Sequence, residues 1–246
     1  MTKYGSNDVA FLLAGGYDLL GFTTQLEDTI EALTEDETVL GEDWVELTAT
    51  GLKRASLTQQ GFYDDEAGAS NAALASGTGV QRVLCYGVEG NTIGKKFTGY
   101  AGALQADYAR IITVGELHKA NASYQGSGVV EEGLIVHAHG AETADGDTED
   151  DKLDNGASSA NGGAGYLQVS ALALDGYDDI AVSILHSADD STYVELLAFT
   201  DVTAAPAAER VEVSGTVNRY IASEWAFEGT GTSPTATFMA GFARNP

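Results

Sequence analysis

The sequence predicts an all-β protein with one short helix, organised as two consecutive β-domains joined by a polar linker. Short segments in which apolar and polar residues alternate recur along the 246 residues, and glycine-containing turns separate them. Proline is nearly excluded from these segments, because Pro206 and Pro246 lie outside them and Pro234 stands at a strand entrance. This pattern is typical of sandwiches and barrels built from antiparallel strands.

The first domain is expected over residues 1–140, as a β-sandwich or barrel. Its predicted strands are 9–14, 44–50, 52–60, 80–88, 93–104 and 129–139. A short helix is expected over 66–76, with Asp64 and Asp65 as its N-terminal cap and Gly77 as its stop. Segment 26–33 is ambiguous: Leu26, Ile30 and Leu33 have helical spacing, while the flanking threonines favour extended chain.

A polar stretch is expected to separate this domain from a second one. Residues 141–164 begin with closely spaced acidic side chains and continue into small residues, which predicts a linker or a long surface loop. The second domain, 165–246, is expected to be a β-sandwich with strands 166–174, 180–186, 193–199, 210–214, 217–227 and 235–242. Within it, Ile180, Val182 and Ile184 should share one face.

Charge is the outlier of the composition. The 37 acidic residues against 12 lysines and arginines give a formal net charge of −25, which disfavours binding to nucleic acid or to anionic membranes. Self-repulsion of this size is screened at molar salt, so the composition predicts adaptation to high salt, with a merely acidic protein as the alternative. No apolar run of membrane-spanning length occurs, and the lone Cys85 in an apolar strand excludes an internal disulfide.

Patterns that could carry chemistry are few. His137 and His139 could place two imidazoles on one face of a strand and hold a metal with Glu131 or Glu132, although polar residues at a strand end are the simpler interpretation. The alternating acids from Asp145 onward lack the glycine and the glutamate that a calcium loop needs. Without a nucleophile, phosphate-loop or paired-cysteine motif, we expect no catalytic residue, no metal and no cofactor. An enzyme with a site assembled from distant residues stays open as a minor alternative.

Several stretches of the first half resemble a known family when taken in order. They are TVLGEDW (38–44), TGLKRASL (50–57), GFYDD (61–65), the alanine-rich helix, YAGAL (100–104) and KANASYQ (119–125). Over about 5–140 the chain resembles the tail tube proteins, or major tail proteins, of long-tailed (siphovirus-like) phages and archaeal tailed viruses. GYLQV (165–169), HSAD (186–189) and TVNRY (216–220) resemble β-sandwich modules appended to such virion proteins.

The resemblance implies a non-enzymatic structural protein of the virion tail, made in the host cytoplasm. Copies would form rings, commonly of six, that stack into a tube with other tail proteins, and viral DNA would pass through the lumen without specific binding. From the net negative charge we expect this lumen to be acidic. Segment 26–43 is the candidate for an assembly arm, with the residues Leu26, Ile30, Leu33, Val39, Leu40, Gly41 and Trp44. The alternative is a virion decoration or glycan-binding β-sandwich protein, in which the second domain contacts host glycans. The aromatics that could line such a sugar site, or could instead be core residues of the sandwich, are Tyr166, Tyr177, Tyr193, Tyr220 and Trp225.

Overall fold

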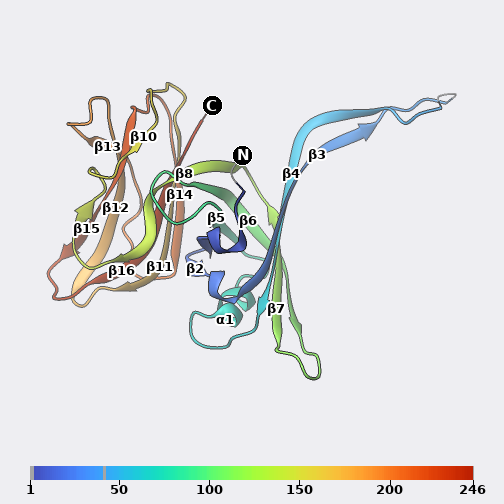
Figure 1. Cartoon of the computed structure of the whole chain (residues 1–246), viewed down its shortest axis with the longest axis horizontal. Helices are drawn as coiled ribbons and strands as arrows, with labels where there is room; N and C mark the ends of the chain where they lie inside the picture. Colours follow the sequence, from blue (N-terminus) through green and yellow to red (C-terminus); the bar gives the residue numbers. More distant parts are fainter. Residues whose placement is uncertain (1–2, 41–42, 246) are drawn as a thin grey trace. The chain divides into compact units, whose positions relative to one another are not determined.

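A computed structural model of the chain describes residues 3–40 and 43–245, and it confirms the all-β class with one short α-helix (Figure 1). The strands are β1 (Phe11–Ala14), β2 (Tyr17–Asp18), β3 (Thr23–Asp36), β4 (Leu47–Phe62), β5 (Gln81–Gly87), β6 (Lys96–Ile111), β7 (Lys119–Gly126), β8 (Val130–Glu142), β9 (Gly146–Asp147), β10 (Leu153–Asp154), β11 (Gly163–Ala173), β12 (Tyr177–Ser187), β13 (Val194–Ala198), β14 (Ala207–Val213), β15 (Tyr220–Gly229) and β16 (Thr235–Arg244). The helix is α1 (Ser70–Ala75), and two 3-10 turns are η1 (Ser6–Asp8) and η2 (Leu20–Phe22).

The chain divides into two compact units that interleave along the sequence. The sandwich unit takes its residues from 1–21, 82–101 and 130–246, and the hairpin unit takes its residues from 22–81 and 102–129. These boundaries differ from the expected domains 1–140 and 165–246, because β8 of the first half pairs along β16 of the second half. Hydrogen bonding between distant strands, which sequence composition does not reveal, therefore sets the division.

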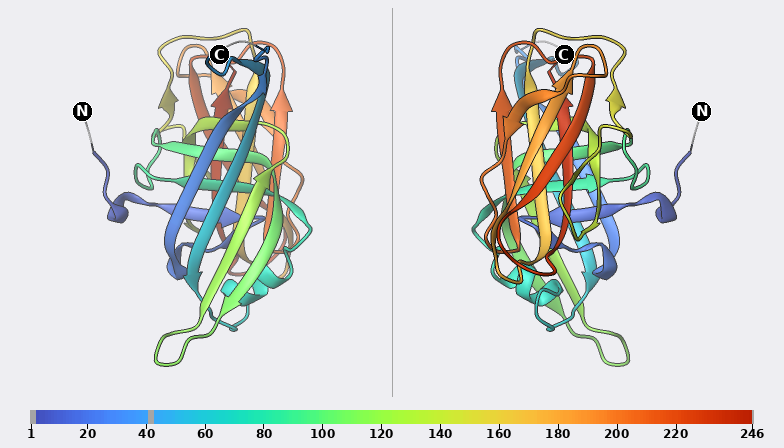
Figure 2. Two further views of the ribbon diagram at one scale, coloured as in Figure 1. Left: turned by 90° about the vertical axis from the view of Figure 1, so that its right-hand side faces the viewer. Right: turned by 90° about the vertical axis from the view of Figure 1, so that its left-hand side faces the viewer.

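The sandwich unit contains two antiparallel sheets, whose strands can be followed in the yellow-green to red ribbons of Figure 2. In the larger sheet β14, β11, β16 and β8 are neighbours, and the smaller sheet has the order β10-β15-β12-β13 with β9 also on β15. Their facing apolar side chains form a buried core. It includes Val136, Leu167, Val169, Phe238 and Phe242 from the larger sheet and Ile180, Val182, Ile184, Trp225 and Phe227 from the smaller one.

A second core lies on the other face of the larger sheet. Phe11 and Cys85, from β1 and β5, pack in one buried cluster with Ile135, Tyr166 and Met239, from β8, β11 and β16. Strands that belong to one hydrogen-bonded sheet thus meet face to face, so this sheet curls over itself within the unit. Cys85 is completely buried here, and burial raises the pKa of its thiol to about 12.

Residues 141–164, expected to form a linker, belong to the sandwich instead. The short strands β9 and β10 both pair with β15. Asp145 accepts a hydrogen bond from the backbone N–H of Phe227 at 2.8 Å, and the buried Thr148 hydroxyl accepts one from Ser223 N–H at 2.9 Å. Leu153 is buried in the core as well. The acidic side chains face water while the backbone and these few side chains hold the segment against the sheet.

The hairpin unit is built on a row of four antiparallel strands in the order β3-β4-β7-β6. Burial alternates along the second half of β4 and along β7, so this part of the sheet has one covered face and one open face. Ala55, Leu57 and Gln59 of β4 and Ala122 and Tyr124 of β7 are on the covered face, and all five are buried. The segment with ambiguous periodicity is thus extended, as part of the 14-residue strand β3.

The helix is shorter than expected and is not capped by the predicted aspartates. It begins at Ser70 with Ala69 as its N-cap residue, and no side chain bonds to the free N–H groups of that cap. Asp64 instead accepts a hydrogen bond from Glu66 N–H at 2.9 Å, which forms a local turn before the helix. The buried Ser70 hydroxyl ties this turn to β4, since it donates to the Phe62 carbonyl at 2.8 Å and accepts from Asp64 N–H at 2.9 Å. The cap prediction for Asp64 and Asp65 was therefore wrong.

Candidate functional site

The candidate site is the outer part of the β3–β4 hairpin, which we call the arm and define as residues 30–55 (Figure 1). Pairing between β4 and β7 starts at Ser56, so beyond that residue β3 and β4 pair with each other. Every described residue from 34 to 54 is exposed. In its described residues from 34 to 54 the arm is thus a two-stranded ribbon without a third strand or a packed face, a class of structure that is marginal on its own in water.

Local hydrogen bonds nevertheless give the ribbon a defined register. Thr34 pairs with Ala49 and Asp36 with Leu47, and a shift in register follows Ala32, where β4 carries two additional residues. Gly51 has a φ of 82° in this bulge, a conformation that glycine adopts without strain. The Thr50 hydroxyl donates to the Leu33 carbonyl at 3.0 Å across the bulge. Backbone pairing, rather than burial, therefore holds the arm together.

The structure brings together most of the residues predicted for the arm. Leu26 lies at the base, half-buried opposite Gln59, whereas Ile30 and Leu33 lie further out on β3. Leu40 is fully exposed and Trp44 is 87% exposed in the connection between the two strands. Val39 also lies in this connection and is exposed, and Gly41 falls outside the described residues.

Three further large apolar side chains are exposed on the same arm: Val45, Leu47 and Leu52. The sequence placed these residues in ordinary strands, where alternation normally predicts a buried face. Large apolar side chains gathered on one exposed element mark an interaction surface. What distinguishes them from core residues is the absence of a covering layer, which only the structure reveals.

The arm is strongly acidic toward its end. Residues 35–47, which we call the arm tip, contain six acidic residues and no lysine or arginine. The Thr38 hydroxyl and N–H both bond to the Asp36 carboxylate, and these bonds lower the pKa of Asp36. Arg54 lies nearer the base and approaches Glu31 at 3.8 Å, with both side chains more than half exposed. The arm tip therefore combines apolar side chains with uncompensated negative charge.

A second exposed apolar group lies at the turn between β6 and β7. The β6–β7 tip, residues 109–119, exposes Ile112, Val114 and Leu117, and Val114 is completely accessible. It carries Arg110 and Lys119 against the single acid Glu116, so its sequence has a net charge of +1 with histidine neutral. This surface was not predicted from the sequence. The three large apolar residues between two polar flanking stretches could have indicated it.

The open face of the hairpin-unit sheet is polar. Rows of cross-strand neighbours place Gln60 beside Asn121, Thr58 beside Ser123 and Ser56 beside Gln125. The row through Thr58 and Ser123 ends in acids, because Thr58 also pairs with Glu27 and Ser123 with Asp107. Asp107 accepts hydrogen bonds from the Ser123 N–H and hydroxyl at 3.1 and 2.7 Å. The centre of this face offers amides, hydroxyls and a few carboxylates to water, and the same register places Arg54 and Lys119 toward its two ends.

The two histidines considered as metal ligands occupy different surroundings. His137 stacks on Phe238 with ring centroids 4.1 Å apart and contacts Trp225 edge-on, and its Nε2 is 3.2 Å from a Glu142 oxygen. The Nε2 atom of His139 lies 2.9 Å from the Ser170 hydroxyl oxygen. Burial lowers the pKa of both imidazoles. Across residues 3–40 and 43–245, no group of three or more potential metal ligands is arranged to hold an ion.

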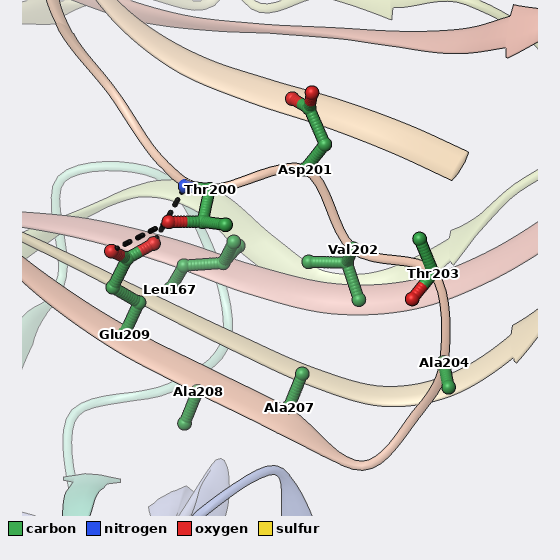
Figure 3. A pocket seen from close by; sticks show the side chains of 9 residues that line it. All are labelled: Leu167, Thr200, Asp201, Val202, Thr203, Ala204, Ala207, Ala208 and Glu209. Atoms are coloured by element: carbon green, nitrogen blue, oxygen red, sulfur yellow. Dashed lines mark hydrogen bonds between the residues drawn. The ribbon is translucent and has the colours of Figure 1, made fainter. Parts of the chain in front are cut away.

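A pocket of about 390 Å³ lies in the sandwich unit beside β14 (Figure 3). Leu167, Val202 and Ala207 line it together with Asp201 and Glu209. The Glu209 carboxylate accepts hydrogen bonds from the Thr200 N–H at 2.7 Å and from its hydroxyl at 3.0 Å. That carboxylate is therefore engaged in fixing the loop that forms the pocket wall.

The aromatic residues considered for a sugar site are mostly structural. Tyr166 and Trp225 are buried. Tyr177 and Tyr220 are half-buried, and the half-buried Tyr193 donates its hydroxyl hydrogen bond to Asp190 at 2.8 Å. No helix of the described chain is both long and apolar enough to cross a membrane.

Comparisons with known proteins find similarity among solved structures alone. No protein-family model and no curated protein sequence matches the chain. A chain from a structure titled as the virion of a native gene transfer agent particle aligns with a TM-score of 0.41 and 12% identity, over 53% of this chain and 98% of that chain. A chain from the tail of an empty gene transfer agent particle, computed with helical refinement, aligns with a TM-score of 0.39 and 14% identity, over 52% and 97%. The crystal structure of the SPP1 Dit protein, described as a hub adsorption apparatus of phages that infect Gram-positive bacteria, aligns with a TM-score of 0.34 and 10% identity, over 95% and 98%. At these TM-scores the similarities establish neither a family nor a function for this chain.

Proposed function

We propose that the chain is a non-enzymatic structural subunit of a viral tail, which self-assembles into rings that stack into a tube. The observation that carries the proposal is the arm, a ribbon that exposes Leu40, Trp44, Val45, Leu47 and Leu52. An isolated hairpin gains little stability from its own contacts, and exposed apolar side chains cost free energy in water. Both costs are removed when the arm packs on another subunit.

The sheet of the hairpin unit supports ring formation. Its order β3-β4-β7-β6 leaves β3 at one margin and the outer half of β6 at the other. Unpaired strand margins are liabilities that closure into a barrel removes. In a ring, β3 of one copy would pair with β6 of the next, and the copies together would form one closed sheet. Six copies per ring is the number that the sequence resemblance implies.

The open face of the same sheet suits a lumen through which DNA moves. Its central rows are hydroxyl and amide side chains, with Glu27 and Asp107 adding negative charge. DNA binding depends mainly on lysine and arginine contacts to phosphates, and such a face gives few of them. We therefore assign this face to the lumen, in the tail of a virion whose other tail proteins cap or adjoin the tube.

Electron microscopy of the purified full-length protein tests the proposal. Negatively stained samples at molar salt should show rings or stacked rings, and sedimentation velocity should show species far larger than the 25.6 kDa chain. A double variant, Leu40→Ser with Trp44→Ser, should reduce assembly while circular dichroism stays unchanged. Wild-type protein that remains monomeric at all concentrations and salts, and that binds glycans, would instead support the decoration or glycan-binding alternative.

A further inference from the structure

Two exposed apolar tips of the hairpin unit lie at opposite ends of the same strand. β4 runs for 16 residues from Leu47, at the arm tip, to Phe62. Phe62 pairs with Lys119, which belongs to the β6–β7 tip. At a rise of about 3.3 Å per residue, the two tips of one copy are about 50 Å apart. They cannot contact each other within one molecule.

The two tips are complementary in chemistry. Each exposes large apolar side chains, Leu40 and Trp44 on the arm tip and Ile112 and Val114 on the β6–β7 tip. The arm tip has six acids and no base, whereas the β6–β7 tip has a net charge of +1 in a chain of net charge −25. Opposite charge orients a contact and disfavours arm-to-arm pairing, and apolar burial supplies affinity that persists when salt screens the charges.

We propose that the β6–β7 tip of one copy is the docking site for the arm tip of a second copy. The inference rests on the proposed function, and it names the receiving surface for the arm. Because donor and acceptor are different surfaces of the same chain, the contact is heterologous, and because they lie at opposite ends of β4, a third copy can add to the second in the same way. Copies joined in this way add along the direction of β4, so the joint gives a stack its polarity and sets no limit to its length.

The first test uses two double variants of the full-length chain. Ile112→Ser with Val114→Ser alters the β6–β7 tip, and Leu40→Ser with Trp44→Ser alters the arm tip. All four side chains are exposed, so the fold should survive, which circular dichroism and thermal melting check. Each variant should require at least about tenfold more protein to reach half-maximal stacking, as measured by sedimentation velocity at molar salt. Val129→Ser, which alters an exposed apolar residue outside both tips, is the matched control and should stack like the wild type.

The second test mixes the two variants, with an affinity tag on one of them. The tip variant retains its arm, and the arm variant retains its acceptor, so the mixture should recover association that neither variant shows alone. An arm-to-arm contact predicts no recovery, and that result would overturn the proposal.

The outcomes also separate this inference from the proposed function. If wild-type rings stack and the tip variant stacks equally well, the acceptor assignment is refuted while a ring-forming subunit stands. If the wild type never associates, both are refuted.

Discussion

The cluster of Tyr166, Glu131 and Arg210 gives the sharpest prediction for stability of the sandwich unit. Arg210 binds both oxygens of Glu131, with its Nε and Nη2 at 2.9 and 3.0 Å, and the Tyr166 hydroxyl donates to the same carboxylate. The side chains of Arg210 and Glu131 are only 12% and 14% exposed. Burial and the bond to Glu131 raise the pKa of Tyr166 far above its usual value, so the phenol stays a donor at any working pH.

Glu131→Ala would leave a nearly buried guanidinium with only the exposed Glu212 as an anionic partner. Removing one member of a buried, hydrogen-bonded pair costs several kcal/mol, because the other charge stays buried. With the residual exposure of this pair, we expect a loss of about 3 kcal/mol in the free energy of unfolding. Tyr166→Phe removes a hydroxyl that donates to an ionised carboxylate and should cost about 1.5–3 kcal/mol.

The adjacent residue supplies the control. Glu132 contacts Lys96 at 3.4 Å with both side chains more than half exposed, so Glu132→Ala should change stability by less than about 0.5 kcal/mol. Urea unfolding followed by tryptophan fluorescence at fixed high salt measures all three variants. If Glu131→Ala lowers the free energy of unfolding no more than Glu132→Ala does, the claim that the buried Arg210–Glu131 pair stabilises the fold is refuted.

Three further results are expected. Melting temperature should fall when salt is lowered from about 2 M to about 0.1 M, because the self-repulsion of net charge −25 is then unscreened, and an unchanged melting temperature would remove the high-salt interpretation. Stability should fall as pH drops from about 6.5 toward 5, because burial lowers the folded-state pKa of His137 and of His139 and unfolding then takes up protons; His137→Gln should reduce this dependence. Ser70→Ala should cost about 1–2 kcal/mol in urea unfolding through the buried bonds of its hydroxyl, whereas Asp65→Ala, at the predicted cap, should cost less than about 0.5 kcal/mol.

Strand positions could be predicted from the sequence because their signal is local. Ile180, Val182 and Ile184 alternate with more accessible residues and are buried as a set in β12. The segment with Leu26, Ile30 and Leu33 could not be predicted in this way. Its local spacing favours a helix, whereas its extended conformation depends on pairing with β4, which is distant in the sequence. Tertiary pairing decided this case.

Predictions from composition were less reliable where contacts span long distances in sequence. The acidic segment 141–164 was expected to be a linker, yet Asp145 bonds to Phe227 and Thr148 to Ser223, more than 70 positions away. A segment whose acidic side chains face water can still form hydrogen bonds to a sheet through its backbone, so acidic composition alone does not identify a linker. The arm residues were selected through the family resemblance. The β6–β7 tip could be identified only from the structure, because Val114 is exposed only where no other element packs over it.

The acidic surface and the apolar tips are opposing requirements of one assembly mechanism. A ribbon that exposes Trp44 and Leu40 would promote uncontrolled aggregation in a neutral protein. At salt low enough to leave these charges unscreened, the six acids of the arm tip repel other arms and the negatively charged body of other copies, so two arm tips approach only against like charge. The β6–β7 tip is less repulsive, because Arg110 and Lys119 outnumber Glu116. Below molar salt, negative charge therefore selects among the apolar contacts that the chain could make, and adding lysines to the arm tip should then produce disordered aggregates rather than tighter stacks.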